Sequence, residues 1–269
     1  MATPPQIEDK SEDDIDDKPM PLLDHLIELR TRLIWSMAAF VIAFAVCYYF
    51  SKNIYTFLAQ PLADILHEKT GQERRMIFTA LTEAFFTYLK VAMFGAAFIS
   101  FPITVTQLWL FVAPGLYRSE KRALLPFLAA TPVLFLLGAS LAYYVIFPMA
   151  WRFFLSFEIP AGEGGLPILL EAKVSEYLGL VMKLIFAFGI AFQLPVGLTL
   201  LAKVGIIDSA GLKKYRRYSY VGMFIVAAVL TPPDVISQLG LAIPLIALYE
   251  LSVVMAKWVE PKPVEDDDA

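Results

Sequence analysis

Two glutamates are the residues of this chain whose type and setting best fit a binding chemistry. Glu28 lies in "HLIELRTRL" (residues 25–33), and Glu120 lies in "FVAPGLYRSEKR" (residues 111–122), where most other charges are basic. A carboxylate that is partly removed from water costs free energy unless a cation meets it. The two carboxylates therefore either pair with basic residues of this chain or receive a cationic segment of another molecule. Arginine suits such a site best, because its planar guanidinium can donate two parallel hydrogen bonds to one carboxylate.

Each glutamate also has an ordinary explanation within its own helix. Glu28 precedes Arg32 by four residues, which is the spacing of an ion pair on one helical face. Ser119 can cap a helix, and Glu120 would then lie in the first turn, where the helix dipole favours an acid. The sequence leaves both explanations open. The binding alternative gains weight because both carboxylates are predicted at the same membrane face.

The chain lacks the residue sets that common catalytic and metal sites need. Its two histidines, His25 and His67, fall on opposite predicted sides of the membrane, and Cys47 is the single cysteine. The sequence contains no GxxxxGK[ST] phosphate loop, no HExxH and no GxSxG in the predicted membrane region. We therefore expect no enzyme activity, no metal and no cofactor.

The elements that must position the two glutamates are long apolar segments. Hydrophobic residues make up 58% of the chain, which is more than a soluble domain of this size needs. A helix needs ~20 residues to cross ~30 Å of hydrocarbon. By this measure four uncharged runs suffice and the last two are short; the six runs cover residues 33–51, 91–117, 123–151, 184–202, 218–233 and 235–249.

The last two runs meet at "TPPDVISQ" (residues 231–238). The Pro-Pro-Asp sequence predicts a turn, and Asp234 is suited to cap the helix that follows. The two runs form either short spans that thin the bilayer locally or a re-entrant hairpin. In both cases the chain returns to the side that it left.

The distribution of basic residues predicts the orientation in the membrane. With a cytoplasmic N-terminus, 14 Lys and Arg residues fall inside and 8 outside, and "KKYRR" at residues 213–217 contributes most. Prolines bend or break helices, and they occur in or near most spans: Pro102, Pro126, Pro132, Pro148, Pro195 and Pro244. We therefore predict an all-α membrane protein with six transmembrane helices, both termini cytoplasmic, and a curved, proline-kinked arrangement with two short final helices.

The charge pattern divides the chain into a membrane domain and two tails. Seven acids crowd residues 8–17 and five crowd residues 260–269, whereas residues 19–259 carry 19 Lys and Arg against 14 Asp and Glu. Such acidic runs are typical of solvated, disordered segments. We therefore predict disordered cytoplasmic tails over residues 1–19 and 260–269, and a six-helix transmembrane domain over residues 20–259.

Five stretches in the same order resemble the signatures of the TatC family, the multispanning subunit of the twin-arginine protein-export system. The similarity extends over roughly residues 20–258. The stretches are "HLIELRTRL" at 25–33, "LTEAFFTYLKVA" at 81–92, "FVAPGLYRSEKR" at 111–122, "AYYVIFP" at 142–148 and "LTPPDVISQ" at 230–238.

The resemblance implies a receptor of the cytoplasmic (inner) membrane. It would recognise the twin-arginine signal peptides of folded precursor proteins at the cytoplasmic face. Single-span membrane proteins of the TatA and TatB type, and other copies of the chain in an oligomeric complex, are the implied partners, and nucleic acid is not among them. Glu28 and Glu120 match the family carboxylates that receive the arginine pair, and Phe111 and Pro114 match residues of the same recognition loop.

The resemblance also implies roles for polar residues within the spans. Tyr143 matches a tyrosine of the third span, and Thr231, Gln238 and Glu250 match positions where partner spans are expected to pack. Glu250 has an alternative explanation as a residue that extends to the interface or joins an internal pair. Gln193 departs from the family, which often has a glutamate there. Because glutamine does not titrate, an obligate proton relay at this position is not expected.

A small-solute or ion transporter is the alternative function that the sequence allows. Such a protein concentrates ionisable groups near the centre of the bilayer. Here both candidate carboxylates are predicted at the cytoplasmic edge, and the polar residue nearest the centre is the neutral Gln193. Depth in the membrane therefore favours the receptor.

Overall fold

A computed structural model describes most of the membrane domain. It describes residues 22–70, 75–112, 125–159, 166, 168–203, 205–231 and 234–259. Pro114, Glu120 and both predicted acidic tails lie outside the described residues. Within the described ranges the chain is helical, with two isolated β-bridges, Ile77–Lys173 and Ile159–Ile168, in the connections.

The helices follow one another with short connections, and helices suit a lipid environment because they satisfy their own backbone hydrogen bonds. In chain order they are α1 (Leu22–Tyr49), α2 (Ser51–Thr70), α3 (Glu83–Val112), α4 (Leu125–Leu141), the π-helix η3 (Ala142–Ile146), α5 (Phe147–Leu155), α6 (Val174–Ala191), α7 (Leu194–Lys203), α8 (Ser209–Lys214), α9 (Arg216–Leu230) and α10 (Val235–Val259).

Five helical segments of the described chain are long and apolar enough to cross a membrane. They are His25–Tyr49, Glu83–Phe111, Pro126–Leu155, Val174–Lys203 and Val235–Val259. They coincide with the first four predicted spans and the last one. The remaining predicted span, α9, has 15 residues and therefore extends only about 22 Å. A sixth full crossing thus stays a prediction.

The prediction of two short final helices holds for α9 and is wrong for α10. The last apolar run of the sequence stops at Glu250, but α10 has 25 residues and extends to Val259. Glutamate is a good helix former, so the charge that ends the apolar run does not end the helix. The Glu250 carboxylate meets a cation and a hydroxyl from α9.

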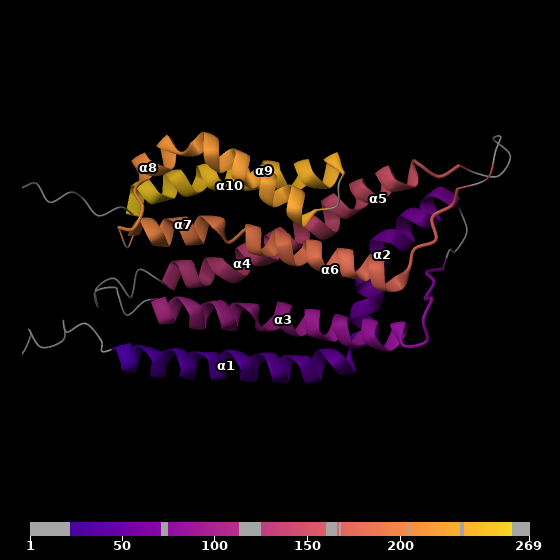
Figure 1. The fold of residues 1–269 in the computed structure, drawn as a ribbon, viewed down its shortest axis with the longest axis horizontal. Helices are drawn as coiled ribbons and strands as arrows, with labels where there is room; N and C mark the ends of the chain where they lie inside the picture. The colour runs from indigo at the N-terminus through magenta and orange to yellow at the C-terminus, as the bar shows by residue number, and fades with distance from the viewer. Residues whose placement is uncertain are drawn as a thin grey trace, which may run out of the picture.

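The helices lie side by side in the order α1, α3, α4, α6 with α7, and then α10 with α9 (Figure 1). The start of α1, the end of α3, the start of α4, the end of α7 and the end of α10 all lie at one end of the molecule (Figure 1). At the opposite end α2 crosses between α3 and α5. The arrangement therefore gathers the segments that the sequence analysis assigned to one membrane face.

Proline residues coincide with irregular points in two of the spans. A π-helical turn, η3, immediately precedes Pro148 at the start of α5, and proline has no amide hydrogen to donate there. The α6–α7 segment is interrupted at Phe192 and Gln193, just before Pro195. These two interruptions are the described counterpart of the predicted proline kinks.

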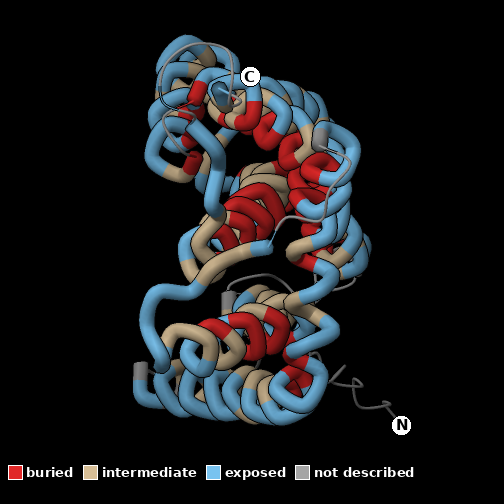
Figure 2. The backbone as a smooth tube through the Cα atoms, turned by 90° about the vertical axis from the view of Figure 1, so that its right-hand side faces the viewer, coloured by how far each residue is buried: buried red, intermediate tan, exposed pale blue. Residues whose placement is uncertain are grey.

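The buried core lies in the middle of the row of helices, between α4, α6 and α10. Its largest fully buried side chains include Phe135, Phe147, Phe188 and Leu241. By contrast α1 packs mainly against α3 and exposes most of its apolar side chains (Figure 2). An exposed apolar face on a long helix is the expected lipid-facing surface of a membrane protein.

Candidate functional site

Glu28 lies in the second turn of α1, beside α3. Arg32 donates from Nε to Oε1 of Glu28 at 2.9 Å, and its Nη2 also donates to Oε1. The ion pair that the four-residue spacing allowed is therefore present. Arg32 also reaches α3, where its Nη1 lies 3.4 Å from Oε1 of Gln107. Gln107 could not be found from the sequence, because its 75-residue separation from Arg32 leaves no periodic signal.

The ion pair with Arg32 involves only one of the two oxygens of the Glu28 carboxylate. Both contacts from Arg32 are made to Oε1, while Oε2 is buried and receives no hydrogen bond from any described residue. A buried carboxylate oxygen without a donor costs free energy, and native proteins leave few of them. Glu28 therefore keeps one acceptor for a further donor.

An aromatic contact joins the start of α1 to the end of α3 next to this pair. The rings of His25 and Phe111 stack with centroids 4.3 Å apart and planes 17° apart. Phe111 is thus brought close to the part of α1 that holds Glu28. Of the four residues assigned to signal-peptide binding, Glu28 and Phe111 lie in the described chain, where Phe111 contacts His25, three residues before Glu28. The other two, Pro114 and Glu120, lie outside it.

The turn between α9 and α10 carries two of the three residues assigned to partner binding, Thr231 and Gln238, together with the predicted cap Asp234. Asp234 caps α10 through a 2.6 Å hydrogen bond from the Ser237 amide to Oδ1. Thr231 ends α9, and its hydroxyl donates to the Ala227 carbonyl at 2.8 Å. Gln238 is half-buried, and no side-chain hydrogen bond to it is found among the described residues. Oδ2 of Asp234 and Oγ of Ser237 also lack a partner in the described chain, but both residues are buried, whereas Gln238 is partly exposed.

Glu250, the third partner-binding candidate, lies within α10 and is paired inside the chain. Its Oε2 lies 2.5 Å from Nη2 of Arg216, and its Oε1 accepts a 2.6 Å hydrogen bond from the Tyr220 hydroxyl. The internal pair that the sequence analysis gave as an alternative is thus the observed state. Arg216 belongs to the basic "KKYRR" cluster, but its pairing with Glu250 could not be predicted from spacing.

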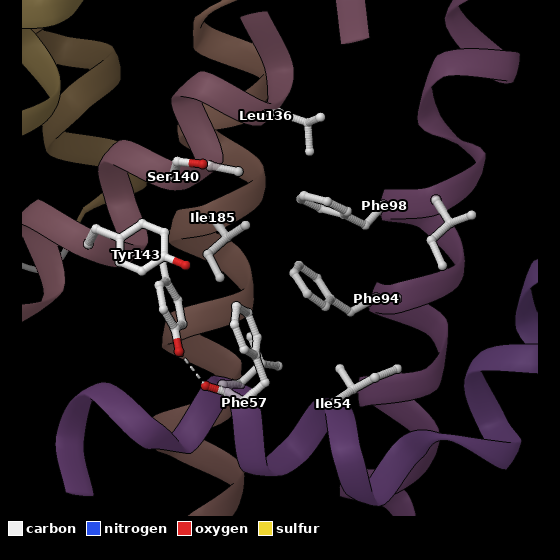
Figure 3. A pocket seen from close by; sticks show the side chains of 13 residues that line it. Ile54, Phe57, Phe94, Phe98, Leu136, Ser140, Tyr143 and Ile185 are labelled. Carbon is white, nitrogen blue, oxygen red and sulfur yellow. Dashed lines mark hydrogen bonds between the residues drawn. The ribbon is translucent and has the colours of Figure 1, made fainter. Parts of the chain in front are cut away.

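Tyr143 anchors η3 to α2. Its hydroxyl donates to the Phe57 carbonyl at 2.6 Å, and its ring stacks on the Phe57 ring with centroids 4.5 Å apart. The same two residues line an apolar cavity of about 330 Å³ between α2, α3 and the α4–η3 segment (Figure 3). No lining residue of this cavity carries a charge. Tyr143 therefore has a structural role at this position.

Gln193 occupies the break between α6 and α7. Its Nε2 donates to the Thr131 carbonyl of α4 at 2.9 Å, and its Oε1 is buried with no partner in the described chain. The side chain thus links the two spans through a neutral hydrogen bond. No group of three or more His, Cys, Asp or Glu residues that could hold a metal ion occurs among the described residues.

Comparisons with known proteins agree on one family for this architecture. The family model described as "Sec-independent protein translocase protein (TatC)" matches residues 24–244. The Sec-independent protein translocase protein TatC of Magnetococcus marinus is 50% identical over 249 residues, covering 93% of this chain and 88% of the relative. The corresponding protein of Rickettsia prowazekii is 48% identical over 237 residues, covering 88% of this chain and 92% of the relative.

A solved structure shares the fold as well as the sequence. The crystal structure of a twin arginine translocase receptor, TatC, matches with a TM-score of 0.72 and 36% sequence identity. The match covers 87% of this chain and 99% of that chain. Sequence and fold therefore point to the same family.

Proposed function

The chain belongs to the TatC family of Sec-independent protein translocase proteins, and on that premise we propose that Glu28 receives a twin-arginine signal peptide. As a member of this family the chain is a membrane-embedded transport protein and not an enzyme. It acts with other components of the twin-arginine translocase. The proposal concerns which of its residues meet the signal peptide and which meet the partners.

The observation that carries the proposal is the free Oε2 oxygen of Glu28. A guanidinium that displaces the atoms covering Oε2 meets an acceptor that the protein has already desolvated, so the hydrogen bond formed is stronger than one in water. Phe111, stacked on His25 close by, offers an aromatic face to the same incoming segment. Glu120 and Pro114 complete the proposed site by resemblance to the family.

The orientation and location of the chain form part of the same proposal. The start of α1 and the end of α10 lie at one end of the molecule. We propose that the chain lies in the inner membrane and that this end faces the cytoplasm. Six crossings then require the short α9 to be accommodated by a thinner bilayer or by a partner helix. Signal peptides would reach Glu28 from the cytoplasm.

The α9–α10 turn is the proposed contact for single-span partners of the TatA and TatB type. Gln238 offers an amide that no described residue satisfies, and Thr231, whose buried hydroxyl donates within the chain, follows the end of α9 in the same turn. A polar group within hydrocarbon gains by meeting a polar group of another span. Glu250 contributes indirectly, by fixing α9 against α10. Further copies of the chain complete the proposed complex.

The cavity between α2, α3 and the α4–η3 segment does not support the transporter alternative. It is lined by apolar residues, Ser140 and two tyrosines, and by no carboxylate or cationic side chain. An ion or charged solute would lose its hydration there without compensation. The receptor function is therefore the one that we propose.

Site-specific photo-crosslinking tests the role of Glu28. A photoreactive amino acid at Thr31, which lies three residues beyond Glu28 on the same helical face, should crosslink to an Arg-Arg precursor and poorly to a Lys-Lys precursor. We expect Glu28→Gln to lower the Arg-Arg crosslink about tenfold, since hydrogen bonds to a charged group contribute about 1.5–3 kcal/mol. Glu68→Gln, an exposed carboxylate on α2, is the control. An unchanged Arg-Arg crosslink in Glu28→Gln contradicts the proposal.

A second experiment addresses the partner surface. Thr231→Val and Gln238→Leu should reduce copurification of single-span partners while leaving the Arg-Arg crosslink at position 31 intact. The opposite ranking would count against the assignment of the two surfaces.

A further inference from the structure

We infer that Arg32 is a positioning residue for twin-arginine recognition, because it holds Oε1 of Glu28 and so leaves Oε2 as the acceptor for the incoming guanidinium. The inference rests on the proposed function, since it specifies how Glu28 would bind an arginine of the signal peptide. Arg32 is thereby part of the recognition site, although its charge has the same sign as that of the signal-peptide arginine.

Arg32 is held from two helices at once. Its Nε and Nη2 both donate to Oε1 of Glu28 on α1, and its Nη1 lies 3.4 Å from Oε1 of Gln107 on α3. Three nitrogens of one planar guanidinium are thus directed at two fixed acceptors. Because the guanidinium is rigid, these contacts determine its plane and, through it, the rotamer of Glu28. An arginine bound in this way is not a loosely held counter-ion.

Burial separates this pair from an ordinary surface ion pair. The side chains of Arg32 and Glu28 are 22% and 21% exposed, and Oε2 of Glu28 is fully shielded. An exposed i,i+4 pair leaves both carboxylate oxygens in water and constrains neither. In Glu28, Oε1 accepts from Arg32, whereas Oε2 is shielded from water and has no donor in the described chain. This asymmetry is what a preorganised acceptor requires.

The geometry changes the expected mode of arginine binding. Arginine was expected because one guanidinium can bind both oxygens of a carboxylate. With Oε1 occupied by Arg32, the guanidinium of a signal-peptide arginine meets Oε2 alone. The Glu28 carboxylate then bridges two guanidinium groups. Arginine remains preferred over lysine, since a delocalised, weakly hydrated cation tolerates a neighbouring Arg32 better than a compact ammonium does. Arg32 therefore contributes to the discrimination between arginine and lysine.

The test compares Arg32 variants of the full chain in membrane vesicles, with the photoreactive residue at position 31 and Arg-Arg and Lys-Lys precursors as probes. Arg32→Gln should lower the Arg-Arg crosslink about fivefold to tenfold and bring the Arg-Arg to Lys-Lys ratio toward one. Arg32→Lys should restore part of the yield but little of the ratio. Gln107→Leu removes only the contact from α3. It should lower both the Arg-Arg crosslink yield and the Arg-Arg to Lys-Lys ratio by about twofold.

Arg217→Gln is the charge-matched control, because Arg217 is an exposed basic residue of the predicted cytoplasmic face that contacts Tyr218 and not α1. It should leave the ratio unchanged. An Arg32→Gln variant that binds the Arg-Arg precursor equally or more tightly overturns the inference, because Arg32 would then be a competitor. If both Arg32→Gln and Glu28→Gln leave the Arg-Arg crosslink intact, the proposed function fails together with the positioning role. If Arg32→Gln leaves it intact but Glu28→Gln lowers it, only the positioning role fails. Should Arg32→Gln not fold, Gln107→Leu decides the question by the same ratio.

Discussion

Glu250 of α10 forms an ion pair with Arg216 of α9, with Oε2 of the glutamate 2.5 Å from Nη2 of the arginine. The two residues are 34 positions apart, and their contact joins α9 to α10 at the end of the molecule where the chain leaves α10. The Tyr220 hydroxyl completes the arrangement from α9. This contact gives the carboxylate of the last span a partner within the chain.

We expect Glu250→Gln and Arg216→Gln each to destabilise the protein. Both side chains are partly exposed, so water screens the pair and the loss should be about 1 kcal/mol or less for each. The double variant should lose less than the sum, because either single change already breaks the Arg216–Glu250 contact. Thermal unfolding of the purified protein in detergent measures all three. Strictly additive losses would contradict the pairing.

Glycines between α4 and α6 provide a second prediction. A Cβ built on Gly138 would lie 2.4 Å from the Phe188 carbonyl oxygen, and one on Gly189 would lie 2.4 Å from the Phe135 ring. Gly138→Ala must push backbone apart and should cost about 1–3 kcal/mol. Close helix approach through small residues is typical of membrane proteins.

Gly179→Ala is the matched control in α6, because its Cβ would meet nothing within 4 Å. It should be neutral or slightly stabilising, since alanine favours a helix over glycine by about 0.5–1 kcal/mol. Expression level and melting temperature report both variants. Equal melting temperatures for Gly138→Ala and Gly179→Ala would show that α4 and α6 do not pack as described.

Tyr143 allows its ring contact and its hydrogen bond to be separated. Tyr143→Phe keeps the stacking on Phe57 and loses the 2.6 Å hydrogen bond to the Phe57 carbonyl, so we expect a loss of about 0.5–1.5 kcal/mol. Tyr143→Ala also enlarges the adjoining cavity and should cost about 3–5 kcal/mol. Unfolding in detergent gives both values. A Phe variant as unstable as the Ala variant would assign the whole effect to the hydroxyl.

Gln193 provides a functional prediction. Gln193→Leu removes the hydrogen bond to the Thr131 carbonyl and should cost about 0.6 kcal/mol, a usual value for interhelical hydrogen bonds in membranes. Because neither residue titrates, we expect export of a twin-arginine precursor to continue at a rate within about twofold of the unchanged chain. Loss of export from a variant that still folds would assign Gln193 an active role in transport.

Local properties of the sequence were sufficient to predict most of the fold. Length and hydrophobicity of an apolar run decide whether it can cross a bilayer, so the first four spans were predicted with their order. Asp234 was recognised as a cap because capping depends on neighbours within four residues. The Glu28–Arg32 pair was likewise visible in a four-residue spacing. Each of these features depends on residues close together in the chain.

Contacts between distant residues were decided only by the tertiary structure. The Glu250 carboxylate meets Arg216, the Arg32 guanidinium reaches Gln107, and the Phe111 ring stacks on His25. None of these pairs has a periodic or local signal, because each is made by helices that the fold brings side by side. The sequence by itself therefore determined a helical membrane protein with TatC signatures and a carboxylate suited to arginine. The packing of α1 on α3 decided which oxygen of that carboxylate is free, since only an atom's three-dimensional neighbours determine whether it has a partner.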